Sequence, residues 1–238
     1  MVFTDRATRL RFGIGLANNG EAEIIRGARE WVRRYIDRVR YWYAKKEPRI
    51  EITLLADNLE FRYKRVQEEL AAKDIIRFFT APRHSSSNGL AERGFGMVRA
   101  MVRCMLKAKD LPVEFWEAAS LHAIYILNRI PFFNNGKFQK DPYQLWYRRV
   151  FDYSKLRIFG SRCYIVDAKT DKSFKVVGKM AIYIGHEEGS NAYQCYVPEI
   201  NDFVTTEDIR FQEAAVDVFE AQRTPTERDS DFHQTERS

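Results

Sequence analysis

The order of its hydrophobic patterns most constrains how this chain can fold. Up to about residue 130, apolar runs typical of strands alternate with three- and four-residue periodicities typical of helices. We expect strands at residues 9–17, 50–56 and 75–79, and helices at residues 21–44, 60–73, 90–107 and 112–129. After residue 155 the pattern changes to short aromatic or β-branched runs separated by turn residues. This order predicts an α/β layer followed by a small all-β barrel.

Changes in composition divide the chain into four parts. The α/β part covers residues 1–130, and a connector with one short helix near residues 143–148 covers residues 131–155. The barrel covers residues 156–213, with strands expected at residues 162–166, 180–185, 192–197 and 202–210. The tail covers residues 214–238, and from Gln222 onward it is polar and acid-rich without an apolar period, which predicts disorder.

Composition narrows the classes of function. The chain has 238 residues, 45% of them apolar, which is enough for a sizeable core. A net charge of +6 fits a phosphate-rich partner and an ordinary basic surface equally well. The three cysteines are never spaced Cys-x-x-Cys, which predicts reduced thiols in an intracellular protein, and the four histidines do not cluster as zinc ligands would. No apolar run approaches the roughly 20 residues that span a bilayer, and no signal peptide is expected.

Two acids stand where a divalent cation could be held. Asp57 follows an apolar run that suits a strand, and Glu92 lies in the first turn of a long helix. Hard cations prefer oxygen ligands, and phosphoryl transfer on nucleic acid is commonly assisted by carboxylate-bound metal ions. The structural alternative stays open, because Asp57 could cap the next helix and Glu92 suits the positive end of its own helix.

The helix at residues 90–107 presents a basic face beside that acid. Positions 92, 99 and 103 fall on one side, opposite a stripe of Met and Val residues. Arg99 and Arg103 are therefore expected along the face that carries Glu92, and Lys107 and Lys109 extend it. Such residues contact phosphates and position DNA without reading its sequence. The alternative is an ordinary solvated helix face.

Several ordered motifs resemble known proteins. In retroviral-type integrases similar segments are a strand-end Phe-x-Asp-Asp-x-Ser-Arg, a Ser-Asp-Asn-Gly-Gly-Glu-Phe and a Thr-x-Pro followed by Gln-Asn-Gly-x-x-Glu-Arg. The matching segments here are Phe3-Thr4-Asp5-Arg6-Ala7-Thr8-Arg9, Leu54-Leu55-Ala56-Asp57-Asn58-Leu59-Glu60-Phe61, Thr80-Ala81-Pro82 and Asn88-Gly89-Leu90-Ala91-Glu92-Arg93. Downstream, five further segments resemble the Pol polyproteins of copia-type retrotransposons. They are Trp116 through Pro131, Asp141-Pro142-Tyr143-Gln144-Leu145-Trp146, Leu156-Arg157-Ile158-Phe159-Gly160-Ser161, Ile182-Tyr183-Ile184-Gly185-His186 and Glu207-Asp208-Ile209-Arg210-Phe211.

The resemblance covers about residues 3–213, in the family's order. It implies an incomplete RNase H-like integrase core, a helical connector and a small Src-homology-3-like barrel. It further implies DNA integration with Mg²⁺ or Mn²⁺, DNA as partner, a possible homo-oligomer and a nuclear location. By this resemblance Asp57 and Glu92 are the catalytic and metal-binding residues. The residues expected to contact nucleic acid are Asn88, Arg93, Arg99, Arg103 and Lys107.

The chain also departs from the family pattern. The family's first catalytic Asp lies on a strand before the segment with which this chain starts, and Asp5 matches a non-catalytic acid. A single Leu59 replaces Gly-Gly, and Gly94-Phe95-Gly96 replaces the usual basic residues. We therefore expect an N-terminally truncated integrase region, an enzyme only by ancestry, that binds DNA and catalyses poorly. Two alternatives stay open: a non-enzymatic module acting on protein or nucleic acid through the barrel, or an upstream exon that supplies the missing Asp.

Overall fold

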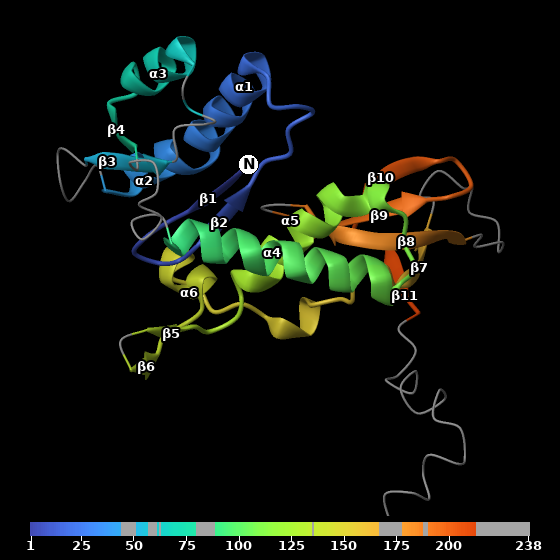
Figure 1. Cartoon of the computed structure of the whole chain (residues 1–238). Coiled ribbons are helices and arrows are strands. Elements are labelled where there is room, and N and C mark those ends of the chain that lie inside the picture. Colours follow the sequence, from blue (N-terminus) through green and yellow to red (C-terminus); the bar gives the residue numbers. More distant parts are fainter. Residues whose placement is uncertain are drawn as a thin grey trace, which may run out of the picture. The chain divides into compact units, whose positions relative to one another are not determined.

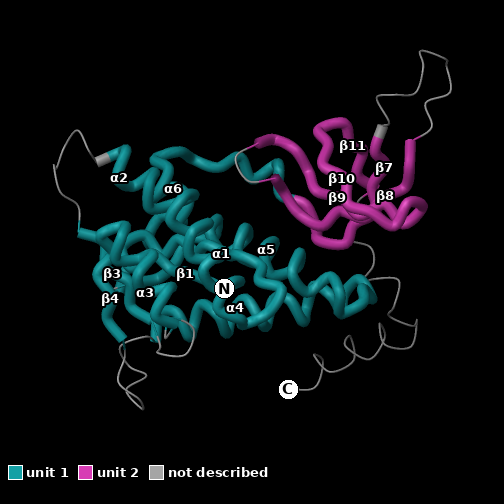
Figure 2. The backbone as a smooth tube through the Cα atoms, turned by 90° about the horizontal axis from the view of Figure 1, so that it is seen from above, with its two compact units in different colours: residues 1–156 teal, residues 157–238 magenta. Residues whose placement is uncertain are grey.

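The structure, a computed structural model, describes residues 1–43, 51–56, 61, 63–79, 89–134, 136–166, 178–187 and 190–212. The chain divides into two compact units, residues 1–156 and residues 157–238 (Figure 2). The elements of each unit are labelled in Figure 1.

The first unit begins with an antiparallel pair of strands. In the pair β1 (Val2–Thr4) and β2 (Arg11–Gly13), Phe3 lies opposite Phe12 and Thr4 lies opposite Arg11. The Asp5 carboxylate accepts hydrogen bonds of 2.7 Å from both the backbone N–H and the hydroxyl of Thr8, so it shapes the turn between the strands. Asp5 therefore has a structural task, in keeping with its match to a non-catalytic acid.

The expected helix at residues 21–44 is confirmed in extent but not in regularity. It consists of α1 (Glu21–Trp31), a π-helical turn η1 (Val32–Ile36) and α2 (Asp37–Tyr43). Its apolar face packs on β1 and β2. The ring of Trp31 stacks on that of Phe3 with 4.4 Å between the ring centres, and the ring centres of Tyr35 and Phe12 lie 3.5 Å apart. The hydrophobic periodicity gave no sign of the π-helical turn, because one extra residue per turn shifts the stripe only locally.

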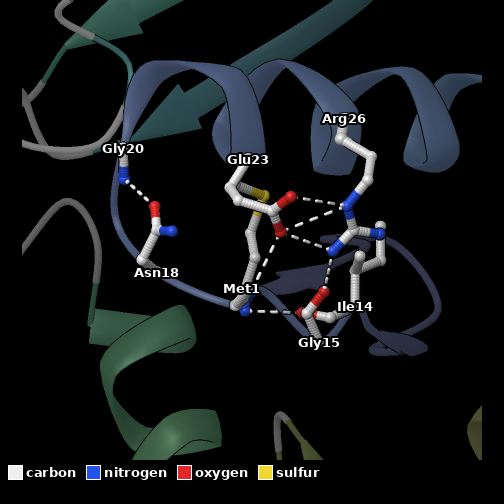
Figure 3. Close-up of polar contacts among 8 residues, drawn as sticks. Met1, Ile14, Gly15, Asn18, Gly20, Glu23 and Arg26 are labelled. Atoms are coloured by element: carbon white, nitrogen blue, oxygen red, sulfur yellow. Dashed lines mark hydrogen bonds and ion pairs between the residues drawn. The ribbon is translucent and has the colours of Figure 1, made fainter.

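Polar contacts attach the first turn of α1 to the strands (Figure 3). Glu23 accepts a 3.0 Å hydrogen bond from the backbone N–H of Ala17 and forms a 2.8 Å ion pair with Arg26. The guanidinium of Arg26 also donates to the carbonyl of Gly15. Acids in the first turn are additionally favoured by the helix dipole. The loop leaving β2 is thus held against the helix that follows it.

A parallel pair of strands forms a second small sheet. In the pair β3 (Ile52–Ala56) and β4 (Ile75–Phe79), Ile52 lies opposite Ile75, and α3 (Lys64–Ala71) connects the strands. We expected the first of these strands to be buried, and that was wrong for one face, because Thr53 and Leu55 are exposed while Leu54 and Ala56 are buried. The core covers one side of this sheet only, so alternate side chains reach solvent.

Both small sheets contribute to one hydrophobic core, yet they remain separate. Phe3, Leu10 and Phe12 pack in the same cluster as Leu54 and Ile75. Among the described residues, β1 pairs with β2 alone and β3 pairs with β4 alone. Each pair therefore has strand edges without a ladder partner, and such edges invite further strand pairing or aggregation. Because of these unpaired edges, we expect the first unit to be only marginally stable.

Two helices and a short connector complete the first unit. These elements are α4 (Gly89–Ala108), a 3₁₀ turn η3 (Val113–Phe115), α5 (Trp116–Leu127), the hairpin β5 (Phe133–Asn134) and β6 (Lys137–Phe138), α6 (Pro142–Tyr147) and a 3₁₀ turn η4 (Tyr153–Lys155). The expected helix at residues 112–129 thus opens as a 3₁₀ turn after Pro112. The hairpin was not expected, although its turn contains the Asn134-Asn135-Gly136 signal and Gly136 has φ +75°.

The buried side chain of Asn128 fastens this connector to β2. Its amide oxygen accepts from the backbone N–H of Arg11 at 2.8 Å, and its amide nitrogen donates to the Arg11 carbonyl at 2.8 Å. The carbonyl of Asn128 also accepts from the backbone N–H of Tyr143. One side chain therefore replaces a neighbouring strand at this point of β2.

The second unit contains a five-stranded antiparallel sheet. Its strands are β7 (Arg162–Val166), β8 (Gly178–His186), β9 (Tyr193–Val197), β10 (Asp202–Thr206) and β11 (Ile209–Phe211). Their order is β10-β9-β8-β7-β11. The expected single strand at residues 202–210 is therefore wrong. The chain bends at Glu207, β10 pairs with β9, and β11 crosses to pair with β7. The acid-rich tail lies outside the described residues.

The core of the second unit contains two thiols. Cys163 and Cys195 are fully buried beside Tyr183 and Val197, and their Sγ atoms lie 3.7 Å apart. All three cysteines of the chain are unbonded thiols, and Cys104 is exposed. Among the described helices, none has the length and apolar character needed to cross a membrane.

Candidate nucleic-acid interface on helix α4

Helix α4 has one packed face and one exposed face. Its packed side rests on α5, where Val98 lies in a cluster with Ala123 and Ile124. The side chains of Met101, Val102 and Met105 surround that cluster. This arrangement confirms the Met and Val stripe seen in the sequence. Because the stripe fixes the rotation of the helix, it also fixes which residues face solvent.

The basic face predicted from the sequence is exposed. Glu92 stands in the first turn, and it is solvent-exposed together with Arg93, Arg99, Arg103 and Lys107. Within the part of the chain that the structure describes, none of these five side chains takes part in an ion pair. An approaching phosphate would therefore meet cations that form no ion pair with the described residues.

The expected pairing of two acids is not covered by the described residues. Asp57 and Asn88 both lie outside them, so the convergence of Asp57 with Glu92 stays a prediction. Where the structure does describe side chains, no three His, Cys, Asp or Glu residues gather closely enough to hold a metal ion. Glu92 itself is an exposed carboxylate without an ion pair to any described residue, so it suits a cation ligand but makes no site alone.

Two buried polar groups lie beneath the start of α4. Thr4 and Arg11 are opposite one another on β1 and β2, and both the Thr4 hydroxyl and the Arg11 Nε are buried without a hydrogen-bond partner among the described residues. Burial lowers the pKa of Arg11 below its ordinary value, and the nearby Arg9 cation lowers it further. A Cβ on Gly94 would lie 2.9 Å from Arg11 Nε. The helix thus approaches the strands closely because residue 94 has no side chain.

Two exposed aromatic rings belong to the same region, and the sequence analysis assigned neither to the interface. Phe95 is 51% exposed and Trp116 is 49% exposed. The guanidinium carbon of Arg99 lies 5.8 Å from the centre of the Phe95 ring. Phe95 lies at the edge of the Met and Val stripe, three residues before Val98, so the sequence pattern gave no sign of its exposure. Trp116 lies in the expected helix at residues 112–129, and only the packing shows that its ring is half exposed.

Comparisons with known proteins agree with the motifs. Residues 161–226 match the family model described as the retroviral polymerase SH3-like domain. The chain is 28% identical over 159 residues to the Retrovirus-related Pol polyprotein from transposon TNT 1-94 of Nicotiana tabacum. That match covers 66% of this chain and 12% of that protein. It is 27% identical over 141 residues to the Retrovirus-related Pol polyprotein from transposon RE2 of Arabidopsis thaliana. That match covers 58% of this chain and 10% of that protein. The chain thus spans about a tenth of these relatives.

Two solved structures are also similar. The catalytic core domain of BIV integrase has a TM-score of 0.45 and 17% identity, and the match covers 62% of this chain and 84% of that one. A chain of the simian T-cell lymphotropic virus intasome in complex with PP2A regulatory subunit B56 gamma has a TM-score of 0.47 and 14% identity, covering 88% of this chain and 70% of that one. The match to the SH3-like domain agrees with the small barrel expected after residue 155, and the RNase H-like integrase core stays a prediction. The chain is therefore similar, over part of its length, to the retrovirus-related Pol polyproteins of copia-type plant transposons.

Proposed function

We propose that this chain is a DNA-binding integrase region whose helix α4 lies along the phosphate backbone. The observation that carries the proposal is the exposed face of α4, where Arg93, Arg99, Arg103 and Lys107 have no ion-pair partner within the described residues. Unneutralised cations spaced along a helix suit a polyanion, because each phosphate contact releases condensed counterions. Ancestry with Pol polyproteins makes DNA the polyanion we expect.

A salt titration with a matched control tests this assignment. The double variant Arg99→Glu/Arg103→Glu removes two phosphate contacts, so the slope of log K against log[salt] for duplex DNA should become shallower by about 2. The control is Arg38→Glu/Arg65→Glu, which makes the same change in net charge at two exposed arginines of α2 and α3. Equal losses in the two variants would show that only total charge matters, and the α4 assignment would fail.

For the chemistry, we propose that Asp57 and Glu92 hold a divalent cation, Mg²⁺ or Mn²⁺. When bound, such an ion stabilises the attacking and leaving oxygens of a phosphodiester. Arg99 and Arg103 would position the DNA strand beside Glu92, since they extend along the same exposed face. Two carboxylates give a divalent cation few ligands. We therefore expect Asp57 and Glu92 to hold the cation weakly and the chain to give little strand transfer.

A plasmid-nicking assay with Mn²⁺ tests that expectation. Wild type should nick supercoiled DNA barely above background. Substantial nicking that disappears in Asp57→Ala and in Glu92→Ala would overturn the proposal of weak catalysis and establish both acids as catalytic. Nicking that survives both substitutions would point to a contaminating nuclease and leave the expected low activity in place.

A second candidate function is a non-enzymatic binding module in the barrel. It is favoured by large side chains on the sheet surface, where Phe203 is 62% exposed and the cross-strand pair Tyr164 and Met180 is 41% exposed at each residue. Exposed apolar surface of this kind commonly marks a protein interface. If Phe203→Ser and Tyr164→Ser abolish a protein interaction while duplex binding stays intact, the barrel carries that second function.

A further inference from the structure

The first unit contains an apolar groove beside the basic face of α4. The groove has a volume of about 280 Å³ and lies between α4, α5 and the strands β1 and β2. Val2, Val98 and Ile124 contribute apolar side chains to its lining, and Phe95 and Trp116 line it as exposed aromatic rings. Arg99 and Arg103, the cations assigned to the DNA backbone, line the same groove.

Close packing on a glycine shapes one wall. A Cβ on Gly13 would lie 2.6 Å from Cδ1 of Ile124 and 2.9 Å from Cδ2 of Leu121. Because residue 13 has no side chain, α5 approaches β2 closely. The groove is therefore bounded by packed secondary structure on this side.

The two helices place an aromatic ring and an arginine near each other at two points. The connection between α4 and α5 is short and the helices pack together, so they run antiparallel. The first turn of α5, with Trp116, therefore faces the half of α4 that carries Arg103. Phe95 and Arg99 lie nearer the start of α4 than Arg103, with the Arg99 guanidinium carbon 5.8 Å from the centre of the Phe95 ring. Each of the two rings therefore shares the lining of the groove with an arginine.

This combination suits one kind of ligand. A nucleotide has a flat apolar base and an attached phosphate, and single-strand binding sites pair aromatic rings with cations for that reason. A duplex hides the faces of its bases in the stack, so it could use the arginines but not the rings. The groove volume is close to the lower limit of small-molecule sites, which fits one or two bases and excludes a packed helix.

We propose that the groove between α4 and α5 receives unpaired bases of a DNA strand whose phosphates lie on Arg99 and Arg103. The inference rests on the proposed function, since it takes DNA along α4 as given. It adds a preference for single-stranded DNA that the basic face alone would not supply. Glu117, which also lines the groove near Gly15, places negative charge there and disfavours phosphate at that point.

Affinity for an oligo(dT) strand and for a duplex of equal length, both measured by fluorescence anisotropy at one salt concentration, tests the inference. Phe95→Ala and Trp116→Ala should each weaken oligo(dT) binding about fivefold or more, because stacking on one ring is lost, and should leave duplex binding within about twofold. The matched control is Phe138→Ala, which removes an 81% exposed ring of the same unit at the β6 hairpin and should change neither affinity. Circular dichroism establishes that each variant is folded.

The outcomes separate the two proposals. If Arg99→Glu/Arg103→Glu weakens duplex binding while the aromatic variants keep full oligo(dT) affinity, the groove inference fails and the proposed function stands. If Arg99→Glu/Arg103→Glu binds duplex DNA as well as wild type does, the proposed function fails, and the groove inference that rests on it fails too. An oligonucleotide that contains 5-iododeoxyuridine should cross-link to Trp116 or Phe95 when the complex is irradiated. Should wild type instead sediment as a dimer that Phe95→Ala/Trp116→Ala converts to a monomer, the groove is a protein interface and the inference is overturned.

Discussion

Two glycines on α4, two residues apart, provide a test of how the helix docks on the strands. Gly94 faces β1 and β2, and a Cβ there would lie 2.9 Å from Arg11 Nε and 3.6 Å from the Thr4 hydroxyl. Gly96 faces open space, with no atom within 4 Å of a Cβ. Both substitutions to Ala should gain up to about 1 kcal/mol of helix propensity. Only Gly94→Ala should also meet a steric cost.

That cost can be estimated from the geometry. The new Cβ would be about 0.5 Å closer to Arg11 Nε than an ordinary contact, and Arg11 is 7% exposed, so it has little room to move aside. Overpacking of this size costs about 1–3 kcal/mol. Gly96→Ala should therefore stabilise the chain by up to about 1 kcal/mol. Gly94→Ala should be less stable than Gly96→Ala by about 1–3 kcal/mol, because the propensity gain cancels in the difference.

Urea unfolding followed by circular dichroism at 222 nm measures both variants on the full chain. The third variant, Arg11→Met/Gly94→Ala, should recover most of the loss, since Met has no atom equivalent to the crowded guanidinium. Equal stabilities for Gly94→Ala and Gly96→Ala would refute the close approach of α4 to β2. The rotation that exposes Glu92, Arg99 and Arg103 would then also be wrong.

Three further predictions concern buried polar groups and the thiols. Arg11→Met alone should raise the free energy of unfolding by about 1–2 kcal/mol, because it removes a buried guanidinium whose Nε has no partner; a loss of stability would show that Arg11 is neutralised by a group outside the described residues. Asn128→Ala should lower the free energy of unfolding by about 2–4 kcal/mol, since it leaves the buried N–H and carbonyl of Arg11 unpaired, and an unchanged unfolding midpoint would contradict that role. Iodoacetamide at pH 8 should modify the exposed Cys104 first, and mass spectrometry should find Cys195 modified only after unfolding, because its hydrogen bond with Cys163 and its burial both raise the pKa of Cys195.

Local sequence patterns predicted most of the elements and one face of the candidate site. A helix repeats every 3.6 residues, so the Met and Val stripe of α4 sets the direction of Glu92, Arg99 and Arg103 without any knowledge of its neighbours. Strands β7, β8 and β9 were predicted with small shifts at their ends, because aromatic and β-branched runs between turn residues are themselves a local signal. Ordered motifs then indicated a resemblance to retrotransposon Pol polyproteins, which the comparisons confirm.

Tertiary contacts decided what no local pattern contains. The break at Glu207 exists because β10 and β11 pair with different strands, β9 and β7. Gly94 weakens a helix in sequence terms, and only its distance to Arg11 shows why a side chain is excluded there. Half-exposed rings at Phe95 and Trp116 border the same groove because two helices and a hairpin meet beside them. Pairing and packing join residues far apart in the chain, and periodicity carries no information about which distant segment will be the neighbour.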